Sequence, residues 1–174
     1  ASDVYKRQLL PSSLSPNIIS TDMSEDDMVF GGMEKLTDTV KAILKQTPKP
    51  RAIVIISSCP AGIIGDDIDM AKALAKPDIP VITVKTDGNL SGDYLQGMLM
   101  CYTELAKQII DPDVPPASDT VNIVFEKVVA KNTENNFEII RGYLDKMGIR
   151  VNCRFLCNTY YDALKGFCSA SLNL

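Results

Sequence analysis

The 174-residue sequence contains no histidine. Nucleophile pairs of the Ser–His or Cys–His kind, and zinc sites built on imidazole, are therefore excluded within this chain. No apolar run approaches the roughly 18–20 residues that span a bilayer, so we expect no membrane partner. The net charge is -4 and no stretch is rich in lysine or arginine, which disfavours nucleic acid as a partner.

The five cysteines are odd in number and none belongs to a Cys-x-x-Cys pair. This pattern favours neither a disulfide framework nor a zinc ribbon. Nothing like a secretory signal precedes them, so we expect reduced thiols and a cytoplasmic protein. Four of them lie within apolar patterns or at a strand end and are expected to be core residues: Cys101, Cys153, Cys157 and Cys168.

The chain is expected to be a fragment with two parts. Residues 1–8 resemble the in-frame translation of a sequencing adapter, so we expect them to be a scar that does not belong to the fold. Residues 9–112 are expected to form the C-terminal part of a first α/β subdomain, truncated upstream. Residues 113–118 belong to a proline-rich linker, and residues 119–174 open a second α/β subdomain.

Helical and strand patterns alternate along both parts. The expected elements are a helix at 33–46, a strand at 51–57, a helix at 66–76, a strand at 80–85, a helix at 93–110, a strand at 120–125, a helix at 134–147, a strand at 149–155 and a helix from 161. This alternation predicts Rossmann-like, three-layer α/β/α subdomains with parallel sheets. The run at 51–57 is almost wholly apolar, which predicts a strand buried on both faces.

Ligands of parallel sheets gather beyond the carboxyl ends of the strands, which selects the loops 57–67, 85–94 and 125–134. In the first loop, Cys59 follows the strand, and Gly62 and Gly65 would let a ligand approach the backbone. A helix beginning near Asp66 would favour an anionic group, a thiolate or the sulfides of an iron–sulfur cluster. The alternative is that Cys59 is a buried small residue and that Asp66 or Asp67 caps a helix.

Two further patterns are open to two interpretations. The pair Gly31-Gly32 could cradle an anion, or it could form a tight turn that opens a helix. Adjacent Asp66 and Asp67 could suggest a magnesium site, but side chains that neighbour each other at a helix start diverge, so capping is favoured.

Two segments carry a resemblance to a known family. Residues 25–32 (EDDMVFGG) and 58–68 (SCPAGIIGDDI) resemble motifs of the nitrogenase component 1 family of oxidoreductases, at about the family's separation. Weaker likenesses lie at 86–92, 121–126 and 148–151.

The resemblance implies several α/β subdomains paired with a homologous subunit. Electrons would come from an ATP-dependent iron protein through an iron–sulfur cluster at the subunit interface. Cys59 matches the last cluster-ligating cysteine that one subunit supplies, and the other ligands would lie upstream of Leu9. The residues expected near the cluster are Ser58 and four glycines, Gly31, Gly32, Gly62 and Gly65. No catalytic residue is assigned.

The chain also departs from the family's pattern, and alternatives follow. The helix after residues 86–92 lacks the histidine of dinitrogen-reducing members, which argues against that branch. The open alternatives for the substrate are dinitrogen, a tetrapyrrole, a sulfur compound or none. A second hypothesis is a non-catalytic scaffold for metallocofactor assembly. A third is an anion- or nucleotide-binding α/β module using residues 62–67, disfavoured because neither GxGxxG nor GxxxxGK[ST] occurs.

Overall fold

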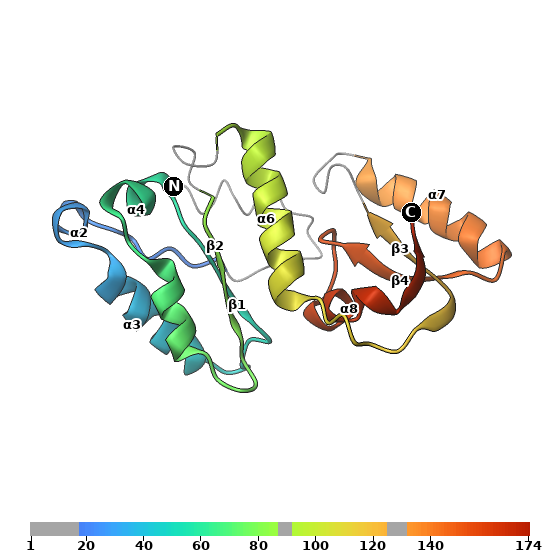
Figure 1. Ribbon diagram of the computed structural model, residues 1–174, viewed down its shortest axis with the longest axis horizontal. Helices are drawn as coiled ribbons and strands as arrows, with labels where there is room; N and C mark the ends of the chain where they lie inside the picture. The colour runs from blue at the N-terminus through green and yellow to red at the C-terminus, as the bar shows by residue number, and fades with distance from the viewer. Residues whose placement is uncertain (1–17, 87–91, 125–131) are drawn as a thin grey trace. The chain divides into compact units, whose positions relative to one another are not determined.

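The computed structural model describes residues 18–86, 92–124 and 132–174, and the chain divides into two compact units (Figure 1). One unit is Ser20–Gln108 and the other includes Ile109–Leu174. Helices and strands alternate in each, and each contains its own parallel sheet, so the expected α/β class is confirmed. Among the described helices, none has the length and apolar character needed to cross a membrane.

The first unit is built around two parallel strands. Its elements are α2 (Glu25–Phe30), α3 (Met33–Leu44), β1 (Ile53–Ile56), α4 (Cys59–Ile64), the 3-10 helix η1 (Ile68–Leu74), β2 (Val81–Val84) and α6 (Tyr94–Ile109), which ends at the boundary. Ile53 lies opposite Val81 and Ile56 opposite Val84. Helix α3 lies on one side of the sheet and α6 on the other (Figure 1).

The core of this unit lies between the sheet, α3 and η1. Leu36 and Val40 of α3 are four residues apart, so both point to the same side of the helix and are buried. They pack with Ile53, Ile55, Ile68, Ala71, Ile79 and Val81. Full burial of one aliphatic side chain of this size contributes about 1.5–3 kcal/mol, so this cluster holds the unit together.

The second face of β1 is not buried, so the expectation of a strand covered on both faces is wrong. Val54 is 44% exposed and Ile56 is 60% exposed, whereas every residue of β2 is buried. Helix α6 is tied to β2, because the Gln108 side chain exchanges hydrogen bonds with the backbone of Thr83. Within the described residues, α6 therefore covers β2 and leaves this face of β1 open.

The segment that follows β1 also differs from the prediction. We expected a loop at 58–62 and a helix at 66–76, but α4 begins at Cys59 and only a 3-10 helix follows. Proline is tolerated in the first turn of a helix, where its missing N–H has no intrahelical partner, so Pro60 does not break α4. Gly65, with a φ of 77°, ends α4 in the left-handed conformation that glycine adopts readily.

Helix α2 was not expected from the periodicity, because it is only six residues long. It begins with a capping interaction in which the Asp27 carboxylate accepts hydrogen bonds from both the backbone N–H and the hydroxyl of Ser24, each at 2.6 Å. Such a reciprocal cap satisfies amide donors that the first turn leaves unpaired.

The second unit contains a three-stranded parallel sheet in the order β4-β3-β5. Its elements are β3 (Ala117–Val124), α7 (Thr133–Lys146), β4 (Arg150–Phe155), α8 (Tyr161–Lys165), the 3-10 helix η2 (Phe167–Ser169) and β5 (Ala170–Asn173). The chain moves from β3 to one neighbour and then crosses to the other. Right-handed crossovers in opposite directions place α7 and α8 on opposite faces of the sheet.

One face of this sheet is apolar and the other carries a buried amide network. Towards α7, a core forms from Val121, Ile123, Phe137 and Leu144. On the other face, the Asn122 amide donates to the Asn173 side chain at 2.7 Å and to the Phe167 carbonyl at 2.8 Å, and its oxygen accepts from Asn152 at 2.9 Å. One asparagine from each strand thus fixes how the strands align.

We predict that Asn122→Ala lowers the free energy of unfolding by about 1–3 kcal/mol, because the buried partners on the neighbouring strands lose their hydrogen bonds. Chemical denaturation followed by circular dichroism measures the change. Asn136→Ala, at an exposed position on α7, is the matched control and should be neutral or slightly stabilising. Equal stability of the two variants would contradict a structural role for the amide network.

Candidate functional site

Cys59 lies where the sequence places it, just beyond the carboxyl end of β1. It is the first residue of α4 and its side chain is exposed. Ser58 is the residue before the helix and has extended backbone angles. The chain therefore turns sharply between strand and helix at this thiol, and the alternative of a buried structural cysteine is wrong.

The other cysteines differ from Cys59 in their surroundings. Cys153 and Cys157 are buried as expected, and burial raises the pKa of both thiols. Cys101 is half-buried on α6 and its thiol pKa is also raised by burial. Cys168 in η2 is exposed, so the expectation of a core residue is wrong there. Burial thus leaves two accessible thiols, and only Cys59 follows a strand of the first unit.

The glycine pair forms the turn between α2 and α3. Gly31 has a φ of 95°, and its N–H donates to the Asp27 carbonyl at 2.9 Å. Gly32 is buried, and a Cβ added to it would lie only 2.7 Å from the Met23 methyl carbon. Gly31 has a backbone conformation that disfavours a side chain. At Gly32 the nearest atoms are the ends of the flexible Met23 and Asp66 side chains, which would have to shift to make room for a Cβ.

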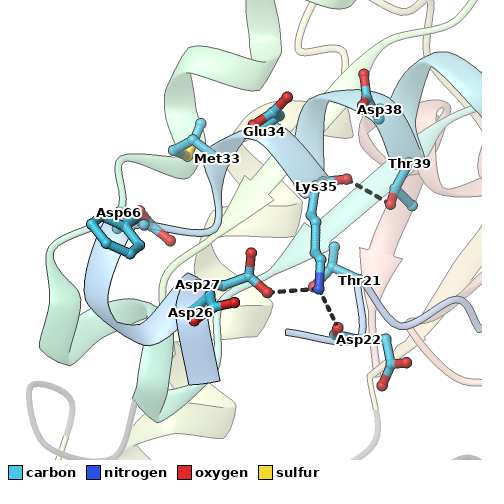
Figure 2. Close-up of a pocket in the computed structure, with 12 residues that line it drawn as sticks. Thr21, Asp22, Asp26, Asp27, Met33, Glu34, Lys35, Asp38, Thr39 and Asp66 are labelled. Atoms are coloured by element: carbon cyan, nitrogen blue, oxygen red, sulfur yellow. Dashed lines mark hydrogen bonds and ion pairs between the residues drawn. The ribbon is translucent and has the colours of Figure 1, made fainter. Parts of the chain in front are cut away.

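The amide of this turn already has an anionic partner, which is the protein's own Asp66. The Gly32 N–H donates to Oδ2 of Asp66 at 2.8 Å, and Figure 2 shows this carboxylate beside the α2–α3 turn. Since Gly32 immediately precedes α3, the carboxylate sits at the amino end of that helix, where negative charge is favourable. The glycine pair is therefore a tight turn, and one of its amides binds the protein's own Asp66; binding of an external anion stays a prediction.

The cap that ends α4 links Asp66 to the helix of Cys59. The Asp66 N–H donates to the Ala61 carbonyl at 3.0 Å, and the Gly65 N–H donates to the Gly62 carbonyl at 3.3 Å. Gly62 lies inside α4, and a Cβ on Gly65 would meet no atom within 4 Å. A six-residue helix is about 9 Å long. Cys59 at the start of α4 and Asp66 just after its end therefore lie close together.

Asp66 and Asp67 point to different partners, as expected for neighbours, and do not form a metal-binding pair. The Asp67 carboxylate accepts from the Asp69 N–H and pairs with Lys85 at 3.0 Å. Lys85 also pairs with Asp69 at 2.7 Å, and Asp69 accepts from the Thr83 hydroxyl. These bonds hold the pKa of Asp69 well below its usual range and raise that of Lys85. The sequence did not reveal this cluster, which ties η1 to the end of β2.

An acidic groove of about 750 Å³ has Gly31 of the α2–α3 turn and Asp66 in its lining. It is lined by Thr21, Asp22, Asp26, Asp27, Phe30, Gly31, Met33, Glu34, Lys35, Asp38, Thr39 and Asp66 (Figure 2). Among these lining residues, Lys35 is the only cation. Its ammonium group lies 2.6 Å from the Asp27 carboxylate and 2.9 Å from the Asp22 carbonyl, so it is used to hold the start of α2.

Some of the expected site lies outside the described residues. Gly88 and the neighbouring loop positions 87–91, and the loop 125–131, belong to this group. In the parts of the chain that the structure describes, no group of three or more histidine, cysteine, aspartate or glutamate side chains could hold a metal ion. Cys59 is thus a single candidate ligand rather than part of a complete metal site.

Fold and site together define an α/β protein with parallel sheets and an exposed cysteine at the carboxyl end of a strand, packed near a glycine turn. A family model described as nitrogenase component 1 type oxidoreductase matches residues 4–174, and the chain belongs to this family.

Its relatives include proteins of two kinds. The chain is 28% identical over 161 residues to the nitrogenase molybdenum-iron protein alpha chain of Methanothermobacter marburgensis, covering 90% of this chain and 33% of that protein. It is 31% identical over 160 residues to the nitrogenase iron-molybdenum cofactor biosynthesis protein NifE of Clostridium pasteurianum, covering 91% and 34%. The chain therefore spans about a third of the length of these relatives.

The fold is also similar to solved structures. A structure of nitrogenase Cp1 at pH 6.5 superposes with a TM-score of 0.78 at 28% identity, covering 92% of this chain and 31% of that one. The fold of this chain is thus similar to about a third of that solved structure.

We predict that Lys35→Met raises the pKa of Asp27 from about 2 towards its ordinary 3.8, because Lys35 is the main cause of the lowered value. Since the pKa is lowered in the folded state, the stabilisation from this carboxylate is present above about pH 3.8 and is lost as the pH falls through about 2. NMR titration of the Asp27 carboxyl carbon measures the shift. Lys41→Met, at the other end of α3, should leave it unchanged, and an unaltered Asp27 in Lys35→Met would contradict the assignment.

Proposed function

We propose that the protein acts as a nitrogenase-like component 1 subunit in which Cys59 ligates an iron–sulfur cluster shared with a homologous partner subunit. The observation that carries this proposal is the exposed thiol at the first residue of α4, directly beyond β1. A thiolate is the ligand that iron–sulfur clusters require.

The candidate ligands among the described residues fit a cluster that is shared with other chain segments, and not one that these residues hold alone. A cubane cluster needs about four protein ligands, and the described part of the chain provides no group of three candidate ligands in one place. Cys59 is exposed and so can reach a group that other chain segments help to hold. The remaining ligands would come from residues beyond this sequence and from the partner.

The surrounding residues would hold the thiol in place. Ser58 has extended backbone angles and precedes Cys59 at the start of α4, and Pro60 restricts the backbone next to the thiol. Gly62 and Gly65 keep one side of α4 free of bulky side chains, while Gly31 and Gly32 do so at the neighbouring turn. When bound, the cluster would supply one-electron transfer; the chain's own contribution is the position of an exposed thiol.

The surface next to this region supports a protein partner as the electron source, which in this proposal is an ATP-dependent iron protein. Val29 is 75% exposed and Phe30 is 86% exposed at the end of α2, immediately before Gly31. Adjacent exposed apolar residues rimmed by carboxylates are typical of interaction surfaces.

We predict that Cys59→Ala, made in the full-length protein assembled with its partner, abolishes the visible absorbance of the interfacial cluster. Loss of one thiolate removes a ligand that no described neighbour can replace. Cys168→Ala is the matched control, since that cysteine is also exposed but lies in the second unit, and it should leave the spectrum unchanged. An unaltered spectrum in Cys59→Ala would remove Cys59 from the ligand set.

A second candidate function is a scaffold that holds a nascent metallocofactor without turnover. It is favoured by the 31% identity to a cofactor biosynthesis protein and by the absence of histidine from the chain. The test is reductant-dependent turnover by the anaerobically purified complex, with dinitrogen, tetrapyrroles and sulfur compounds as substrates. Turnover of any of them supports the enzyme, and a stable cluster without turnover supports the scaffold.

A further inference from the structure

Asp66 joins the two motifs of the site through one carboxylate. Its Oδ2 accepts the Gly32 N–H at 2.8 Å, and a Cβ on Gly31 would lie 3.2 Å from its Oδ1. The carboxylate therefore lies against both glycines of the α2–α3 turn. At Gly31 the carboxylate adds to the constraint that the positive φ already sets.

The backbone of Asp66 is held equally firmly to the helix of Cys59. Its N–H is bonded to the Ala61 carbonyl within α4, and the left-handed Gly65 fixes the direction in which the chain leaves that helix. A displacement of α4 would therefore move the Asp66 carboxylate with it and break the bond to Gly32.

The residue that precedes α3 cannot cap the amino end of this helix with its own side chain. The residue before α3 is Gly32, which has no side chain to accept from the exposed amides of the first turn. Asp66 supplies both the acceptor and the negative charge from a position 34 residues away. The Asp66 side chain thus links the amino end of α3 to the carboxyl end of α4.

We infer that Asp66 is a positioning residue that sets the place of Cys59 by locking α4 against the Gly31-Gly32 turn. This inference rests on the proposed function for its consequence, since the group that Cys59 would position is the shared cluster. The lock itself is a property of the chain and is measurable without the cluster.

The test uses the full-length protein assembled with its partner and compares four variants. Asp66→Ala removes the bond. Asp66→Asn keeps an acceptor oxygen but removes the charge. Gly32→Ala keeps the carboxylate but crowds it, because the new Cβ would lie 3.0 Å from Oδ2 and 2.7 Å from the Met23 methyl carbon, so these side chains must shift. Asp67→Ala is the matched control, because this neighbouring carboxylate pairs with Lys85 instead.

Two quantities are measured for each variant: hydrogen exchange of a peptide spanning residues 31–34, and iron bound per assembled complex. In Asp66→Ala, loss of a hydrogen bond to a charged acceptor should speed exchange at Gly32 about tenfold. Bound iron should fall severalfold, and the absorbance per iron should change. Gly32→Ala should behave in the same way, whereas Asp66→Asn should retain most of both properties and Asp67→Ala should match the unmodified protein.

The outcomes separate this inference from the proposed function. If Cys59→Ala loses the cluster but Asp66→Ala and Gly32→Ala retain normal iron and exchange, the positioning role is overturned while the proposed function stands. If Cys59→Ala keeps the cluster, the proposed function fails, and exchange in Asp66→Ala still tests the lock. If Asp66→Ala does not assemble, Asp66→Asn and Gly32→Ala decide: equal losses in both, or no loss in Gly32→Ala, overturn the inference.

Discussion

The region around Cys59 depends on one hydrogen bond, from the Gly32 backbone N–H to the Asp66 carboxylate. Gly32 is buried, so without this acceptor its N–H would be cut off from water at a cost of about 1–3 kcal/mol. The same bond caps α3 and attaches α4 to it. Two short segments that could each adopt other conformations are thereby held in one arrangement, and the position of Cys59 follows from it.

The charged groups of the first unit mainly fix the positions of short segments. Lys35 holds the start of α2 through Asp27, and Lys85 holds η1 through Asp67 and Asp69. These pairs are largely solvent-exposed, and such ion pairs contribute little to the free energy of folding. Stability comes from the apolar core between β1, α3 and η1. The apolar core holds β1, α3 and η1 together, and the ion pairs attach the neighbouring short segments to them.

The long elements could be predicted from the sequence because their periodicity is local. The helix at Met33–Leu44 and the strand at Val81–Val84 were found to within two residues of their ends. The short helix α4 was missed because Pro60 and Gly62 are typical of loops. Its formation depends on proline being acceptable in a first turn and on the cap that follows. The sequence does not predict strand β5, because four residues are too few to show an alternation of apolar and polar side chains. The strand is defined by its pairing with β3.

The sequence by itself determined the alternation of helices and strands, the family, and the position of Cys59 shortly after a strand. These properties depend on residues adjacent in the chain. Only the tertiary structure decided that the anion at the glycine turn is Asp66, that Val54 and Ile56 lie on an uncovered face, and that Cys168 is exposed. Each of these depends on which residues from distant parts of the chain lie nearby. The exposure and hydrogen-bond partners of a residue are determined only when those neighbours are in place.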